Sequence, residues 1–296
     1  MTHVSRRQLL AGLSLSFITP TAVWAAGTSP SEQVRELEAA AGGRLGVAAL
    51  DLGTNAYWHY RADECFAMCS TFKFLAAAFV LARVDRGQES LSRRITYDLR
   101  DLVDYSPITA PHAGTAEMDI AALCEAAVTV SDNTAANLIL ESFGGPAGLT
   151  KYLRSLGDEV TRLDRIEPEL NEATPGDPRD TTSPAAMLGL MRRLLIGDAL
   201  KADSRARLVG WLKACTTGDS RLRAGLPSGW IAGDKTGTGH HGSTNDIVIA
   251  WPPKAGKNGR APILIAAYYT GSQSQQATRD YVLAEVARIL ARRIVG

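Results

Sequence analysis

The spacing of apolar and polar residues follows two different patterns along the chain. Four short apolar runs, each bounded by turn-forming residues, have the length and composition of β-strands: residues 45–51, 57–60, 246–251 and 262–269. Between about 70 and 220 the apolar residues recur at helical spacing, and long polar connections separate the helical segments. The sequence therefore predicts strands near both ends and helices in the middle.

Each end of this pattern also carries a predicted helix. The first begins at Ser29-Pro30-Ser31-Glu32, where serine can cap the helix and glutamate can complete a capping box, and it ends at Gly42-Gly43. The last has an apolar face made of Val282, Leu283, Val286, Ile289 and Leu290.

The most economical topology joins the first two strands and the last two or three in one antiparallel sheet. We expect an α+β fold in which a five-stranded antiparallel sheet is flanked by the N- and C-terminal helices, over residues 27–62 and 221–296. Residues 63–220 are then an inserted all-α lobe. A cleft between two lobes commonly binds a small molecule.

Residues 1–26 have the character of an export signal rather than of the fold. Arg6-Arg7 precedes an apolar core over 9–18, and small residues follow at Ala25-Ala26. The core is too short to span a bilayer, and the paired arginines resemble a twin-arginine signal. We expect cleavage near Ala26 and a periplasmic mature protein; the alternative is an uncleaved membrane anchor.

Composition narrows the possible partners. The net charge is only +1, from 32 basic and 31 acidic residues, and no basic block stands out. The apolar and charged contents, 45% and 21%, are those of an ordinary globular protein. We therefore expect no nucleic-acid partner. We also expect a monomer with no stable membrane association after removal of the signal.

The first candidate chemistry is the stretch Ser70-Thr71-Phe72-Lys73 at the start of an apolar helical run. On a helix, Ser70 and Lys73 are neighbours on one face. A serine becomes a nucleophile when a base takes its proton, and a lysine can be that base if burial lowers its pKa. The alternative interpretation is a capping serine followed by a solvated lysine.

Three remote stretches supply what this pair lacks. Ser131-Asp132-Asn133 lies at a predicted loop-to-helix junction, where side chains can point into a cleft. The run 235–239, Lys-Thr-Gly-Thr-Gly, can form an edge whose backbone N–H groups bind an oxyanion. A long charged loop over 165–180 contains Glu167-Pro168-Glu169-Leu170-Asn171, and loops of this length in compact enzymes are commonly functional.

Together these motifs, in this order and at these separations, resemble the class A serine β-lactamases, from about Arg44 to the C-terminus. The resemblance implies a β-lactamase/D,D-peptidase-like fold and hydrolysis of penicillins and cephalosporins through a serine acyl-enzyme, which gives resistance to these antibiotics. No cofactor is implied. The catalytic residues it implies are Ser70, Lys73, Ser131 and Glu167, and the implied oxyanion donors are the N–H groups of Ser70 and Thr238.

The resemblance also implies a set of substrate-binding residues: Tyr105, Asn133, Asn171, Arg221, Lys235, Thr236 and Gly237. Arg221 is the candidate for holding the substrate carboxylate, because Thr244 stands where some relatives have an arginine. The alternative for Arg221 is a surface arginine with no role in binding. The alternative for Tyr105, which would line the entrance of the cleft, is an ordinary core or surface tyrosine. Arg165 and Asp180 resemble an ion pair that fixes the ends of the long loop. Whether Lys73 or Glu167 activates Ser70 stays open.

Two groups of residues depart from the family pattern or invite other interpretations. Cys124 and Cys69 match halves of disulfides in some relatives, but Ala77 and Gly239 occupy the partner positions, so we expect neither bond. His240-His241 would point to opposite faces of a strand, and no metal site is predicted.

Two other functions share parts of this motif set. A penicillin-binding D,D-peptidase would have the serine and lysines but would not need Glu167 with Asn171 to release its acyl group. A non-catalytic β-lactam or peptidoglycan sensor would have broken motifs, whereas the principal positions are intact here.

Overall fold

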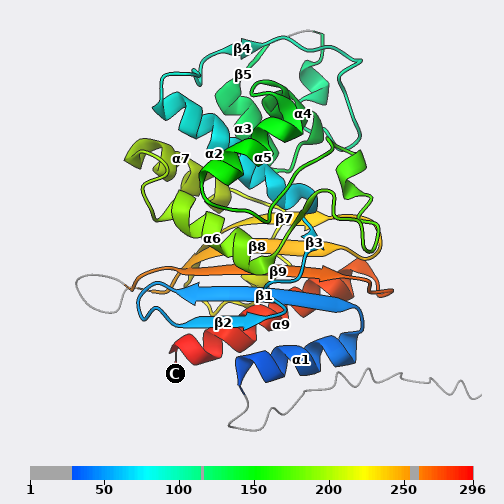
Figure 1. The fold of residues 1–296 in the computed structure, drawn as a ribbon, viewed down its shortest axis with the longest axis vertical. Coiled ribbons are helices and arrows are strands. Elements are labelled where there is room, and N and C mark those ends of the chain that lie inside the picture. Colours follow the sequence, from blue (N-terminus) through cyan, green and yellow to red (C-terminus); the bar gives the residue numbers. More distant parts are fainter. Residues whose placement is uncertain (1–28, 115–116, 254–259, 296) are drawn as a thin grey trace, which may run out of the picture.

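The computed structural model describes residues 29–114, 117–253 and 260–295. The predicted export signal lies outside the described residues. The centre of the fold is one antiparallel sheet in the order β2-β1-β9-β8-β7 (Figure 1). Its strands are β1 (Arg44–Asp51), β2 (Tyr57–Tyr60), β7 (Ile231–Thr238), β8 (Thr244–Trp251) and β9 (Ile263–Thr270). The expected α+β class and five-stranded sheet are confirmed.

The sheet is buried on both faces. Ile247 and Ile249 of β8 belong to the core shared with the helical part, whereas Val248 and Ala250 belong to a second core beneath the sheet. The second core includes the apolar face predicted for the last helix, α9 (Gln276–Val295), together with Val34 of α1 (Pro30–Ala41). Burial on both faces explains why β8 and β9 are continuous apolar runs rather than alternating ones.

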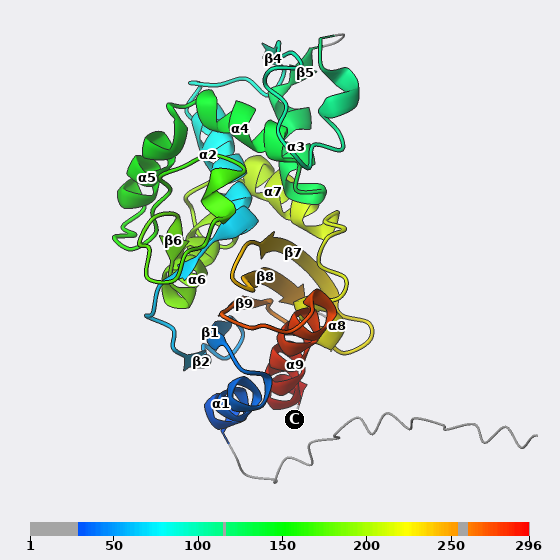
Figure 2. The ribbon, with the colours of Figure 1, turned by 90° about the vertical axis from the view of Figure 1, so that its right-hand side faces the viewer.

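The chain leaves the sheet after β2 and returns to it at β7, and most of the intervening helices form a layer above the sheet (Figure 2). These are α2 (Phe72–Asp85), α3 (Ile120–Thr129), α4 (Asn133–Glu141), α5 (Gly145–Ser155), α6 (Pro184–Leu195) and α7 (Ala202–Lys213). Helix α6 packs on β1 and β9, and the short α8 (Leu222–Gly225) packs on α9.

Short elements complete the connections. Two small antiparallel pairs are formed by β3 (Phe66–Ala67) with β6 (Thr181–Thr182) and by β4 (Arg94–Ile95) with β5 (Met118–Asp119). Single 3₁₀ turns occur at η1 (Cys69–Thr71), η2 (Ala110–His112) and η3 (Glu169–Asn171). The pairing of β3 with β6 brings the end of the long loop close to Ser70.

Local signals located the first helix correctly. Ser29 accepts a hydrogen bond from the Glu32 N–H, and the Glu32 side chain accepts one from the Ser29 N–H, which is the predicted capping box. Gly42 and Gly43 follow the helix with positive φ. Within the described residues, no helix combines the length and apolar character needed to cross a membrane.

Candidate active site

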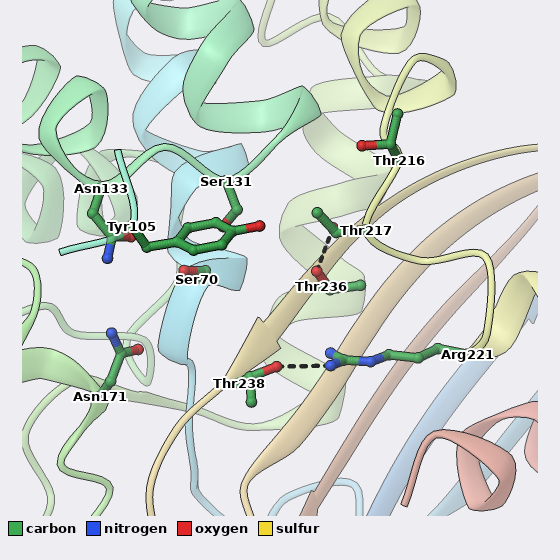
Figure 3. A pocket seen from close by; sticks show the side chains of 10 residues that line it. All are labelled: Ser70, Tyr105, Ser131, Asn133, Asn171, Thr216, Thr217, Arg221, Thr236 and Thr238. Atoms are coloured by element: carbon green, nitrogen blue, oxygen red, sulfur yellow. Dashed lines mark hydrogen bonds between the residues drawn. The ribbon is translucent and has the colours of Figure 1, made fainter. Parts of the chain in front are cut away.

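Ser70 lies in the η1 turn that leads into α2 and faces a pocket (Figure 3). The preceding residue, Cys69, has a φ of +45°, a conformation that is uncommon for a residue with a side chain and that clusters at functional sites. The Ser70 hydroxyl donates a hydrogen bond to Glu167 Oε1 at 3.1 Å. A carboxylate 97 positions away in the sequence is therefore in direct contact with the candidate nucleophile.

Lys73 lies one turn along, and its side chain is fully buried. Its Nζ is 2.9 Å from Glu167 Oε1 and donates to the Ser131 carbonyl at 2.8 Å, to Ser131 Oγ at 3.3 Å and to Asn133 Oδ1 at 2.5 Å. Burial lowers the pKa of Lys73, while the Glu167 carboxylate opposes that shift. The solvated lysine of the alternative interpretation is therefore wrong.

Ser131 and Asn133 enter the site from the junction before α4. Ser131 has a φ of +63°, and Asp132 caps α4 by accepting the Ala135 N–H at 2.8 Å. Asp132 also accepts the N–H groups of Ile108 and Thr109, each at 2.9 Å. One buried carboxylate thus joins the serine-bearing loop to the loop that carries Tyr105.

Strand β7 forms the opposite wall. The Lys235 Nζ donates to Ser131 Oγ at 3.0 Å and to the Thr236 carbonyl at 2.9 Å, and burial lowers the pKa of Lys235 to about 8. A Cβ on Gly237 would lie 2.6 Å from the Met68 carbonyl oxygen, so a side chain here would push β7 away from the Ser70 turn. Thr238, next along the strand, lines the pocket together with Ser70.

The long loop delivers Glu167 into this space with its side chain fully buried. Asn171 Nδ2 donates a hydrogen bond to Glu167 Oε2. The buried Asn171 Oδ1 has no partner among the described residues, so one amide acceptor is available beside the carboxylate. The Asn137 side chain of α4 also pairs with both backbone groups of Glu167, each at 2.9 Å.

The ends of the loop are held together as the resemblance implied. Arg165 Nε lies 2.6 Å from Asp180 Oδ2, and the Asp180 side chain is 1% exposed. Asp180 Oδ1 accepts the backbone N–H groups of Asp164 at 2.7 Å and Arg165 at 2.9 Å. Arg165 has a second carboxylate partner, Glu172, which the sequence did not suggest.

Arg221 is buried, so the surface-arginine alternative is wrong. Its Nε pairs with Asp280 at 2.8 Å, its Nη1 donates to the carbonyls of Gly237 and Asn245, and its Nη2 donates to Thr238 Oγ1 at 2.7 Å. Tyr105, in contrast, is 61% exposed at the rim of the pocket and has a φ of +63°.

These residues enclose a cavity of about 550 Å³. Its lining comprises Ser70, Tyr105, Ser131, Asn133, Asn171, Thr216, Thr217, Arg221, Thr236 and Thr238. Three buried basic side chains, Lys73, Lys235 and Arg221, lie around the cavity, with Glu167 paired to Lys73 and Asp280 paired to Arg221. Buried positive charge beside the nucleophile suits an anionic ligand. The set provides a nucleophile, a base in contact with it and a second hydroxyl held by two lysines, which together suit acyl transfer.

Cysteine and histidine do not contribute to this chemistry. The four cysteines are free thiols, and Cys65 is the exposed one. Within residues 29–114, 117–253 and 260–295, no three His, Cys, Asp or Glu side chains are grouped to hold a metal ion.

Sequence reasoning missed several contributors. Asn137 lies four residues after Asn133 on the same helix face, a spacing that could have placed it near the site. Thr217, whose hydroxyl is 2.6 Å from that of Thr236, and Asn245 carry no local signal. They follow only from the packing of the sheet against the helices.

Comparisons with known proteins agree with this geometry. A sequence model described as "Beta-lactamase enzyme family" matches residues 29–294. β-Lactamase CTX-M-8 of Citrobacter amalonaticus is 45% identical, and β-lactamase Toho-1 of Escherichia coli is 46% identical, each with 98% of both chains covered. The solved structure of an ancestral class A β-lactamase has a TM-score of 0.86 and 63% identity, covering 90% of this chain and 100% of its own.

A putative class A β-lactamase from Rhodopseudomonas palustris is also similar, with a TM-score of 0.86 and 56% identity, covering 89% of this chain and 99% of its own. The fold and the site define a serine acyl-transfer enzyme, and the chain belongs to the β-lactamase enzyme family, in class A. Its activity is therefore hydrolysis of β-lactams, with resistance to these antibiotics as the consequence. The comparisons give no support to the peptidase or sensor alternatives.

Proposed function

We propose that this enzyme opens the β-lactam amide of penicillins and cephalosporins by acylating Ser70. The Ser70 oxygen attacks the carbonyl carbon as its proton moves to Glu167, 3.1 Å away. Glu167 is favoured over Lys73 as the acylation base, because the hydrogen bond from Ser70 goes to the carboxylate. The backbone N–H groups of Ser70 and Thr238 are the donors for the oxyanion.

The leaving nitrogen needs a proton, and a continuous path can supply it. Glu167 Oε1 lies 2.9 Å from Lys73 Nζ, which in turn lies 3.3 Å from Ser131 Oγ. As the C–N bond breaks, Ser131 gives its proton to the nitrogen and is reprotonated by Lys73, which takes the proton that Glu167 received. Lys235 holds Ser131 from the other side at 3.0 Å.

Release of the acyl group is assigned to Glu167 and Asn171. The carboxylate accepts a proton from a water molecule as that water attacks the ester, and Ser70 regains its proton as the leaving group. The observation that carries this assignment is the buried amide–carboxylate pair with its remaining acceptor, Asn171 Oδ1. General-base assistance of this kind contributes roughly a hundred- to ten-thousand-fold in rate.

For substrate binding we propose that Lys235, Thr236 and Arg221 hold the carboxylate of the β-lactam. Asn133 bonds the amide side chain of the substrate, and Tyr105 closes the rim. Four of the five N–H groups of Arg221 have partners in the protein, so its contribution to the substrate carboxylate is its charge and one Nη2 N–H.

The central test is to trap the intermediate. The Glu167→Ala variant, mixed with a penicillin, is expected to gain the mass of the intact drug on Ser70 more slowly than the native enzyme, with Lys73 left as the base, and to retain it, whereas the native enzyme turns over a chromogenic cephalosporin continuously. A Glu167→Ala variant that releases product at the native rate would overturn the assignment of Glu167. A variant that is acylated on Ser70 as fast as the native enzyme would show that Lys73, rather than Glu167, is the acylation base.

We also propose that residues 1–26 direct export to the periplasm by the twin-arginine route and are removed, leaving a monomer. The support is the order of paired arginines, apolar core and small residues. N-terminal sequencing of the protein from a periplasmic fraction is expected to begin near Gly27, and replacing Arg6 and Arg7 with lysine should leave unprocessed protein in the cytoplasm. Processing that continues unchanged in this variant would rule out the twin-arginine route.

A further inference from the structure

The proposed oxyanion hole is assembled from two separate elements. One donor, the Ser70 N–H, comes from the η1 turn, and the other, the Thr238 N–H, comes from the end of β7. Misplacing catalytic groups by about 1 Å can cost about a hundred-fold in rate. The separation between the turn and the strand must therefore be held by contacts between these two elements.

Asn245 of β8 bridges these two elements. Its Nδ2 donates to the carbonyls of Ala67 at 2.9 Å and Met68 at 3.1 Å, three and two residues before Ser70 respectively. In the sheet, Asn245 pairs directly with Gly237, the residue before Thr238. Asn245 is 1% exposed, and its side chain takes no part in the proposed chemical steps.

The surroundings leave Asn245 little freedom. Its Oδ1 accepts the Tyr269 N–H at 3.4 Å, and its backbone carbonyl accepts from Arg221 Nη1 at 2.9 Å. Gly237 approaches the same carboxamide closely, since a Cβ there would lie 3.3 Å from Asn245 Nδ2. The strand end, the nucleophile turn and the carboxamide therefore pack as one unit.

We propose that Asn245 is a positioning residue that sets the distance between the two oxyanion donors. Its carboxamide holds the carbonyls that precede Ser70 against β7, so that both N–H groups point to the same carbonyl oxygen of the bound β-lactam. Asn245 does not contact the reacting atoms. This proposal rests on the proposed acylation of Ser70.

The test measures how strongly the acyl carbonyl is polarised. Asn245→Ala is made in the Glu167→Ala protein, the acyl-enzyme is trapped with a penicillin, and the ester C=O stretch is recorded by infrared difference spectroscopy. We expect the stretch to move to higher frequency, because weaker hydrogen bonds polarise the carbonyl less. In the Asn245→Ala enzyme that keeps Glu167, the second-order rate constant of acylation, measured at low substrate concentration, should fall about ten-fold or more.

A matched control separates positioning from a general loss of stability. Tyr269→Phe removes buried hydrogen bonds of the same sheet, to the carbonyls of Ala41 at 3.2 Å and Gly42 at 2.7 Å, on the side away from the pocket. This variant should keep the native stretch and acylation rate even if its melting temperature falls. If Asn245→Ala does not fold, Asn245→Ser is measured in the same way, because its short hydroxyl cannot span to both carbonyls.

The outcomes are distinct. An Asn245 variant with the native carbonyl stretch and the native acylation rate would overturn the positioning role. A carbonyl shift that also occurs in Tyr269→Phe would overturn it too, because the effect would then follow stability alone. If neither the Glu167→Ala parent after long incubation nor the native enzyme after rapid quench carries an adduct on Ser70, the acyl-enzyme mechanism fails instead, and that failure is visible before any Asn245 variant is compared.

Discussion

Replacing Asn137 with alanine would test whether the backbone of Glu167 must be clamped for the acyl-enzyme to be released. Asn137 Nδ2 donates to the Glu167 carbonyl and Asn137 Oδ1 accepts the Glu167 N–H, both at 2.9 Å. Truncation to alanine removes both bonds but leaves the carboxylate, Asn171 and the ends of the loop unchanged. The expected defect is therefore in the placement of Glu167 rather than in its chemistry.

The magnitude follows from the two backbone groups. A buried N–H or C=O that loses its partner costs about 1–3 kcal/mol, so the two together weaken the closed loop by about 2–6 kcal/mol. At 1.4 kcal/mol for each factor of ten, that corresponds to about 30- to 20,000-fold. The Arg165–Asp180 pair still holds the loop ends, so we expect the lower end, about 30-fold slower release.

Release is measured directly by forming the acyl-enzyme with a penicillin and following loss of the adduct by rapid quench and mass spectrometry. Asn137→Asp, which keeps an acceptor for the Glu167 N–H, should lie between alanine and the native protein. Ser142→Ala removes a 2.7 Å bond to the Ile139 carbonyl at the end of the same helix and should release at the native rate. A folded Asn137→Ala enzyme that releases its adduct as fast as the native one would refute the reasoning.

Three further predictions concern the charged groups around the site. Asp180→Ala leaves Arg165 without its main partner, so the free energy of unfolding should fall by about 3–5 kcal/mol at most, and the melting temperature with it. Release of the acyl group should slow more than acylation, and equal slowing of both steps would contradict a role of this ion pair in placing Glu167 for release. Burial lowers the pKa of Lys235 to about 8, so its charge is present below that pH and lost above it, and kcat/KM should decline as the pH rises through 8. Because the unfolded lysine keeps its proton to higher pH than the folded one, the free energy of unfolding should rise as the pH increases from about 8 to 10. In Lys235→Arg the decline of kcat/KM should vanish, and its persistence would assign the decline to another group. Arg221→Ala should raise KM about ten-fold for a cephalosporin but little for the same cephalosporin with its carboxylate blocked as the methyl ester. Equal effects on both substrates would show that Arg221 acts through Asp280 and the strand rather than on the substrate carboxylate.

Local features of the chain were readable from the sequence alone because their causes are local. The capping box at Ser29, the end of the first helix at Gly42 and the apolar face of the last helix depend on neighbours within a turn or two. The Ser70–Lys73 spacing belongs to this group as well, since a helical turn brings residues three apart together. The motif set was sufficient to predict the family, and the order of strands and helices was sufficient to predict the α+β class.

The contacts between motifs depended on the tertiary structure. Glu167 reaches Ser70 across 97 positions, because the loop is closed by Arg165 and Asp180 and clamped by Asn137. No local propensity encodes such a contact. Its energy comes from burying and pairing polar groups that are far apart in the chain, which happens only after the lobes have packed.

Arg221 and Asn245 show the same limit most clearly. The sequence proposed Arg221 for the substrate and left a surface position open, but the sheet register buries it between Asp280 and the strand carbonyls. In the sequence, Asn245 is an ordinary polar residue before an apolar run. It faces the turn before Ser70 only because β8 pairs with β7 in the folded sheet. The sequence by itself determined which groups the enzyme has and where each local element begins. The tertiary structure determined which of those groups touch, because register and packing, rather than propensity, set distances between remote residues.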